Sequence, residues 1–239
     1  METSEQLCER IARDKKDVIC SFSMGKDSIA TYIQLKRHFE RVHNVFYFMI
    51  PNLKFQRESL DYYEQKFGEK ITVIPSPHWY THLYKLMYQS PDRITAIDNW
   101  IYDNKLYIPT YDQLFSAVKS ALGLSQDTYV GTGVRMNDSL TRRLTIKKYG
   151  AENKKRKQFF PVFDWNIEKV KNEIRDSKIK LPVDYKIWGR TFDGLEMAFL
   201  KGLKDNFPQD YETVKFWFPF VEMDFLRFRD FCELKNKKE

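Results

Sequence analysis

The sequence predicts an α/β protein, a three-layer sandwich with a mainly parallel central sheet and a helical C-terminal part. Between residues 17 and 74, short apolar runs rich in β-branched and aromatic side chains alternate with segments of helical periodicity. A further run of this kind follows at 128–130. This alternation is typical of β-α-β units, whose parallel strands are joined by right-handed crossovers.

Composition supports a folded chain. Of the 239 residues, 42% are hydrophobic and 16% aromatic, which supplies a core and excludes a disordered protein. We expect a domain over residues 1–200 and an aromatic-rich helical extension over residues 201–239. Cys8, Cys20 and Cys232 form neither a disulfide framework nor a Cys-x-x-Cys site, and no apolar signal or membrane segment is evident. These features favour a cytoplasmic protein.

The charge indicates an anionic partner, either a nucleotide or a nucleic acid. The chain carries a net charge of +7, and its basic residues concentrate in 142–157 and in the tail at 235–238. A solvated basic face is the alternative for both segments.

The elements follow in order along the chain. We expect strands at 17–22, 44–50, 71–74 and 128–130, and helices at 4–16, 29–39, 55–67, 110–122, from 139 onward and at 167–174. Residues 88–109 are poorly periodic and have prolines near both ends, so we expect an irregular connection over the site. The aromatic-rich residues 208–235 predict helices packed on the body or a homodimer interface, with a base-stacking surface as the alternative.

The turn after the first strand, residues 23–28 (SMGKDS), has the residue types of an anion site. A strand that leads through a tight turn into a helix directs the unpaired N–H groups of the helix at one spot. Lys26 adds a charge, Ser23 and Ser28 add hydroxyl groups, and Gly25 allows close approach of the backbone. The alternative is an ordinary turn in which Asp27 or Ser28 caps the helix.

A second polar constellation lies at residues 127–143 (DTYVGTGVRMNDSLTRR). A short strand, a glycine-rich turn and a helix would bring Arg135, with Arg142 or Arg143, toward the same edge of the sheet. Arginine grips phosphate or sulfate with two parallel hydrogen bonds. For Arg142 and Arg143 the alternative is a solvated helix face.

Both stretches resemble motifs of one superfamily. The turn is similar to the S-G-G-x-D-S pyrophosphate loop of the PP-loop ATP pyrophosphatases (adenine nucleotide alpha-hydrolase-like), and within them it most resembles the phosphoadenosine-phosphosulfate (PAPS) reductase family. Met24 stands where a second glycine is usual. The second stretch resembles the family's G-x-R-x-x-E-S-x-x-R segment, with Asp138 where glutamate is usual; the matching residues are Gly133, Arg135, Ser139 and Arg142. The resemblance covers residues 17–194.

The resemblance implies a nucleotide site and its residues. It implies ATP or a related adenine nucleotide, with magnesium held by Asp27. The implied catalytic residues are Lys26, Asp27, Arg135 and Arg142. The implied nucleotide-binding residues are Ser23, Met24, Gly25, Lys26, Asp27, Ser28, Asn52, Gly133, Arg135 and Ser139. In many relatives the corresponding segment can lead into cysteines; because residues 181–195 here do not, we expect no iron–sulfur cluster.

Three functions are compatible with this resemblance. The first is a transferase-type reaction that adenylates an acceptor, which the sequence does not identify, and releases pyrophosphate. The second is PAPS or APS reduction, although Cys232 lacks the glycine and histidine that flank the reductase cysteine. The third is a catalytically silent module that binds a nucleotide or a nucleic acid.

Overall fold

The computed structural model describes residues 2–192 and 194–227, and the chain divides into two compact units. Unit 1 comprises residues 1–47, 60–74 and 110–182, and unit 2 comprises residues 48–59, 75–109 and 183–239. This division differs from the predicted boundary at residue 200. Residues 183–200 group with the C-terminal helices because Leu195, Phe199 and Leu200 lie in the same apolar core as Val214 and Phe218.

The sheet and its helices have the predicted alternation. The elements in chain order are α1 Ser4–Asp14, β1 Asp17–Ser21, α2 Lys26–His38, β2 Arg41–Phe48, α3 Lys54–Phe67, β3 Thr72–Pro75, α6 Tyr111–Ala121, β4 Tyr129–Gly131, the 3-10 turn η1 Met136–Asp138, α7 Leu140–Tyr149, β5 Glu152–Asn153, β6 Gln158–Phe159 and α8 Ile167–Asp176. The strand order is β3-β2-β1-β4-β6-β5. Strand β1 is parallel to β2 and β4, β4 is parallel to β6, and the short β5 pairs antiparallel with β6. The predicted α/β class with a mainly parallel sheet is confirmed.

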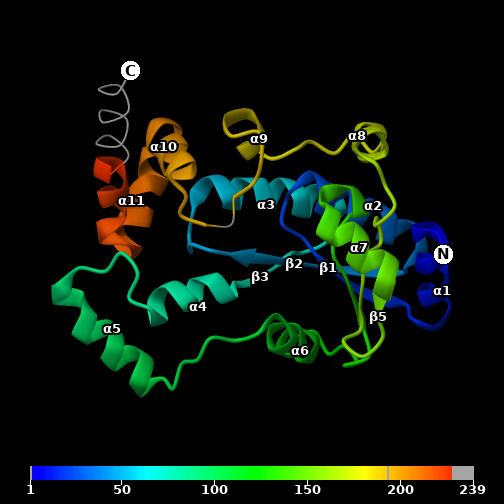
Figure 1. Ribbon diagram of the computed structural model, residues 1–239, viewed down its shortest axis with the longest axis horizontal. Coiled ribbons are helices and arrows are strands. Elements are labelled where there is room, and N and C mark those ends of the chain that lie inside the picture. Colours follow the sequence, from blue (N-terminus) through cyan, green and yellow to red (C-terminus); the bar gives the residue numbers. More distant parts are fainter. Residues whose placement is uncertain (1, 193, 228–239) are drawn as a thin grey trace. The chain divides into compact units, whose positions relative to one another are not determined.

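Helices cover both faces of this sheet within unit 1 (Figure 1). On one face, Ile19 of β1 and Val45 of β2 pack with Phe115 of α6. On the other, the ring of Phe22 meets Phe67 of α3 edge-on, with 5.5 Å between ring centroids, and Tyr32 of α2 stacks on the same ring. Burial on both faces explains the continuous apolar runs at 18–20 in β1 and 45–48 in β2.

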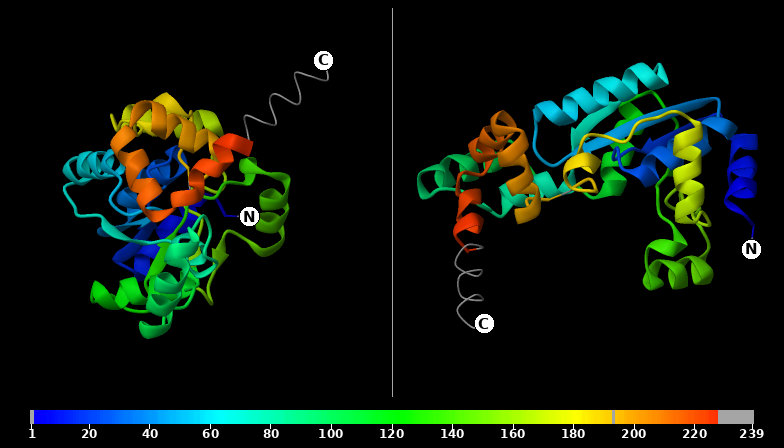
Figure 2. Two further views of the ribbon diagram at one scale, coloured as in Figure 1. Left: turned by 90° about the vertical axis from the view of Figure 1, so that its left-hand side faces the viewer. Right: turned by 90° about the horizontal axis from the view of Figure 1, so that it is seen from above.

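Unit 2 is helical around its own aromatic core. Its helices are α4 Pro77–Tyr84, α5 Pro91–Asp103, α9 Asp184–Ile187, α10 Met197–Asn206 and α11 Pro208–Trp217, followed by the 3-10 turn η2 Pro219–Glu222. Figure 2 shows α10 and α11 side by side. Trp217 lies edge-on against Trp79, with 4.6 Å between ring centroids, and Phe218 is fully buried. As far as residue 227, Trp217, Phe218 and Val221 pack into this core, whereas Phe216 and Phe220 are exposed. The rest of the predicted extension, with Cys232, lies outside the described residues.

The segment predicted to be irregular is helical instead. Residues 91–103 form α5, which begins with Pro91 after its N-cap Ser90. No residue of α5 is buried, but Ile94, Ile97 and Ile101 stand at helical spacing, so the segment is more periodic than the sequence analysis took it to be. The antiparallel pair β5–β6 was also missed, because strands of two residues give no periodic signal.

None of the helices in the described part of the chain is long and apolar enough to cross a membrane.

Candidate functional site

The predicted anion loop joins β1 to α2 in unit 1. Helix α2 starts at Lys26, and its N-cap is Gly25, with φ −70° and ψ 157°. The Ser28 hydroxyl donates to the Gly25 carbonyl (2.9 Å) and lies 3.2 Å from the Ser23 hydroxyl. Within the described residues no side chain caps α2, so neither Asp27 nor Ser28 takes the capping role of the alternative reading. Because the loop leads from the carboxyl end of β1 into α2, the positive end of the helix lies at the carboxyl edge of the sheet.

Met24 keeps a backbone conformation that favours glycine. Its φ of 60° lies in the left-handed region, which costs an L-residue about 1–2 kcal/mol. The side chain is only 1% exposed, so its burial offsets this cost. Because the methionine side chain is buried, it leaves the solvent side of the loop open despite the departure from the family pattern.

The second constellation lies directly against the loop. A Cβ added to Gly133 would stand 2.8 Å from the Asp27 carbonyl oxygen and 2.9 Å from its carbon. Arg135 is 5% exposed, and its Nε lies 2.9 Å from Oδ1 of Asp27. Two stretches that are about a hundred residues apart in sequence thus meet at the start of α2.

Charged side chains form one network at this junction. Asp27 also pairs through Oδ2 with the Lys26 ammonium group (2.7 Å). Asp138 accepts from the Arg135 backbone N–H (3.0 Å) and pairs with Nη2 of Arg135 (2.7 Å) and Nη1 of Arg142 (2.8 Å). Three cations and two carboxylates leave one positive charge in excess, which favours an anion.

One contact in this network is incomplete. Nε of Arg135 and Oδ1 of Asp27 are within ion-pair distance but are not aligned for a hydrogen bond, and among the described residues neither atom has another hydrogen-bond partner. A buried donor without an aligned partner lowers the stability of the fold. A small shift of Arg135 toward a bound anion would therefore lose little free energy, since no aligned hydrogen bond at Nε has to break.

The remaining residues of the predicted site lie on α7, at the edge of the charged network and in unit 2. Ser139, rather than Asp138, caps α7 by accepting the N–H of Arg142 (3.2 Å). The Arg142 side chain is 51% exposed, at the rim of the network. Asn52 belongs to unit 2, with φ 63°.

A polar residue that the sequence analysis did not single out lies on β2. Asn44 is 1% exposed, and neither atom of its amide has a hydrogen-bond partner among the residues described. Its register partner in β1 is Cys20, one residue before the end of that strand. In the sequence, the feature that points to this residue is a single amide side chain at the start of the apolar run 44–50.

The two described cysteines are buried. Burial raises the pKa of the Cys8 thiol to about 12 and raises that of Cys20 well above its usual range. Both are therefore protonated at neutral pH and poor nucleophiles.

Comparison with known proteins gives similarities of fold. The chain is similar to the phosphoadenylyl-sulfate (PAPS) reductase from Candida auris in its phosphate complex, at 12% identity over 81% of this chain and 88% of that chain, with a TM-score of 0.47. It is also similar to the U34-tRNA thiolase NcsA from Methanococcus maripaludis, at 11% identity over 92% of this chain and 79% of that chain, with a TM-score of 0.44. No protein-family model and no curated protein matches the chain. At these identities and TM-scores the similarity extends to no activity.

The expectation about cofactors requires correction. NcsA was solved with a [4Fe–4S] cluster on a similar fold, so the expectation that such a chain holds no iron–sulfur cluster was wrong. A single segment without cysteines excludes only one arrangement of ligands, because a fold can supply ligands from several elements.

Proposed function

We propose that this chain binds the triphosphate of an adenine nucleotide at residues 23–28 and transfers the adenylyl group to an acceptor, releasing pyrophosphate. The observation that carries this proposal is the buried Arg135, which reaches Asp27 of the loop while Gly133 packs on the Asp27 backbone. The choice of an adenine base rests on the sequence resemblance, and the anion site rests on these contacts.

Two physical features support phosphate binding at this point. The N-terminus of α2 offers backbone N–H groups and a partial positive charge. Lys26, Arg135 and Arg142 surround it with side chains that suit phosphate oxygens. Asp27 holds Lys26 and Arg135 in place through its two oxygens, so its proposed role is to position these cations.

The proposed reaction is a displacement at phosphorus. An acceptor oxygen forms a bond to the α-phosphorus as the bond from that phosphorus to the bridging oxygen of the β-phosphate breaks. The electron pair of the broken bond leaves with pyrophosphate, and a hydroxyl acceptor releases its proton to solvent. The cations stabilise the charge that develops on the phosphate oxygens, and such preorganised stabilisation lowers the barrier.

Calorimetric titration of ATP into the wild type and into Lys26→Ala tests the binding step. Loss of a charged hydrogen bond costs about 1.5–3 kcal/mol, so we expect binding about 10- to 150-fold weaker in the variant. Lys36→Ala is the matched control, since Lys36 lies on the same helix and pairs with Glu69 on the surface. Equal ATP affinity in the wild type and Lys26→Ala would refute the site.

Release of pyrophosphate with candidate acceptors tests turnover. Binding of ATP without release under any acceptor would favour the silent nucleotide-binding module. Reduction of a sulfonucleotide that is lost in Cys232→Ser would favour the reductase alternative, whose cysteine lies outside the described residues.

A further inference from the structure

The positive charge of the chain is concentrated in one segment of unit 1. Residues 140–157 contain eight lysines and arginines and a single acid, Glu152, so they carry a net charge of +7, which equals that of the whole chain. The charges of all other residues therefore cancel. This segment comprises α7 and the β5–β6 hairpin up to its last strand.

Most of these cations are not used in holding the fold together. Three pair with carboxylates: Arg142 with Asp138, Arg156 with Asp112 and Lys157 with Asp127. Within the part of the chain that the structure describes, the other five are exposed and have no carboxylate at ion-pair distance; they are Arg143, Lys147, Lys148, Lys154 and Lys155. Unpaired, exposed cations on adjoining elements form a surface that attracts a polyanion.

Helix α7 also exposes apolar side chains. Ile146 is the one buried residue of this helix, whereas Leu140 is 69% exposed and Tyr149 is 70% exposed. The ammonium group of Lys148 lies 4.9 Å from the centre of the Tyr149 ring. An exposed aromatic ring beside a lysine is the arrangement on which proteins stack unpaired bases.

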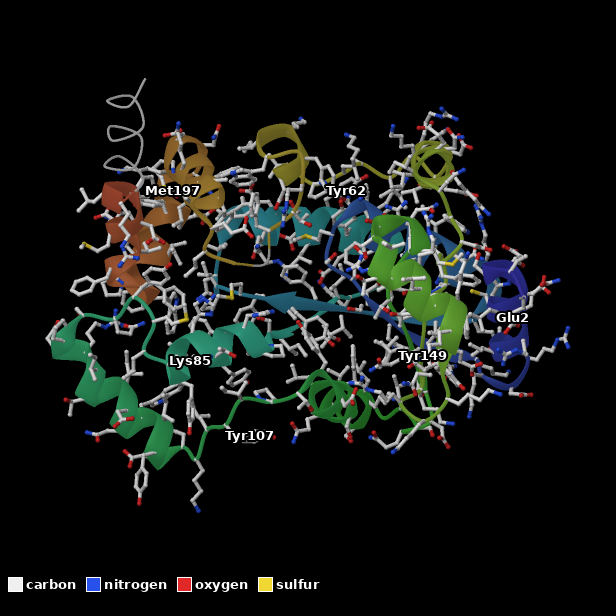
Figure 3. The ribbon with its side chains drawn as sticks, in the orientation of Figure 1. Glu2, Tyr62, Lys85, Tyr107, Tyr149 and Met197 are labelled. Atoms are coloured by element: carbon white, nitrogen blue, oxygen red, sulfur yellow. The ribbon has the colours of Figure 1, made fainter. Side chains whose placement is uncertain are left out.

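A hollow of about 440 Å³ lies beside Tyr149. Its lining is partly apolar, from Leu7 and Phe163, and partly charged. The cations Arg10 and Lys154 are matched there by Glu2 and Glu152, and both carboxylates pair with Arg10 (2.8 and 2.7 Å). Glu2 lines the same hollow, and Figure 3 labels it together with Tyr149. A flat group with polar edges, such as a nucleobase, matches a hollow with an aromatic wall, an apolar floor and charged rims.

We propose that α7 and the β5–β6 hairpin bind a nucleic acid with at least one unpaired base, whose phosphates lie along the five cations and whose base stacks at Tyr149. A duplex offers no free base face to the ring, so single-stranded segments or loops are preferred. This inference is independent of the proposed adenylation, because it depends on a different set of side chains.

Fluorescence anisotropy with labelled single-stranded 12-mers of RNA and DNA, and with their duplexes, tests the proposal. Binding by about five cations predicts that the logarithm of the association constant falls with the logarithm of salt concentration with a slope of about −3.5 for a single strand. In Lys147→Ala/Lys148→Ala the slope becomes shallower by about 1.4. The control Lys15→Ala/Lys16→Ala removes another adjacent pair of lysines, which precedes β1 and lies outside the basic segment, and leaves the slope unchanged.

Two substitutions of Tyr149 test whether a base stacks on its ring. Tyr149→Ala weakens binding of the single strand about 5- to 150-fold, and Tyr149→Phe, which keeps the ring, binds as the wild type does. Thermal unfolding of each variant confirms that it is folded, and ATP titration of the same samples separates this proposal from the nucleotide site. Oligonucleotide binding that is absent at 50 mM salt, equal in all variants, or replaced by binding to phosphatidylserine vesicles or to polyaspartate would overturn the proposal.

Discussion

Replacement of Gly133 by alanine tests the junction between the two motifs. The added Cβ would stand 2.8 Å from the Asp27 carbonyl oxygen, whereas ordinary contact begins at 3.4 Å, so the two segments must separate by about 0.6 Å. The atoms that it meets belong to the backbone, so no change of rotamer relieves the clash. Overpacking of this kind costs about 1–3 kcal/mol, and we expect the free energy of unfolding to fall by this amount. Because the displaced backbone begins α2, ATP affinity should also fall.

Urea denaturation and ATP titration of Gly133→Ala measure the two effects. Gly194→Ala is the control, since a Cβ at Gly194 meets nothing within 4 Å. If Gly133→Ala matched the wild type in both stability and affinity, the close contact between the motifs would be refuted.

Two further predictions concern stability. Met24→Gly relieves about 1–2 kcal/mol of left-handed backbone strain but removes a buried side chain whose loss costs about 2–5 kcal/mol. Urea denaturation should therefore show a lower free energy of unfolding in the variant. A higher free energy of unfolding would contradict the burial of Met24. Burial raises the pKa of Asp184 from 3.8 to about 6, so this carboxyl contributes stability below pH 3.8 that is lost as the pH rises through 6. The stability of Asp184→Asn relative to the wild type should therefore increase by about 2 kcal/mol from pH 4 to pH 7, and a difference independent of pH would contradict the burial of this group.

The sheet and the meeting of the two motifs were predictable from sequence for a simple reason. Parallel strands place their carboxyl ends at one edge, and both polar stretches directly follow a buried strand. Strand β1 ends at Ser21, β4 ends at Gly131, and the two strands are neighbours in the sheet. Once these strands are identified, contact between residues 23–28 and Arg135 follows from topology.

The remaining features depend on tertiary contacts that leave no local pattern. Asp138 could cap α7 by its residue type, but it instead pairs with Arg135 and Arg142, and Ser139 takes the cap. The left-handed conformation of Met24 contradicts its intrinsic preference and depends on burial of the side chain. Helix α5 has no buried face, so its position in unit 2 could not be inferred from periodicity.

The most direct test of the central claim is hydrogen–deuterium exchange with and without ATP, because it locates the bound nucleotide without a mutation. We predict slower exchange in two separate peptides, one covering residues 23–29 and one covering residues 132–136, with both effects saturating at the same ATP concentration. Protection of only one of these peptides, or of neither while ATP protects another part of the chain, would contradict the claim that one nucleotide binds where the two motifs meet.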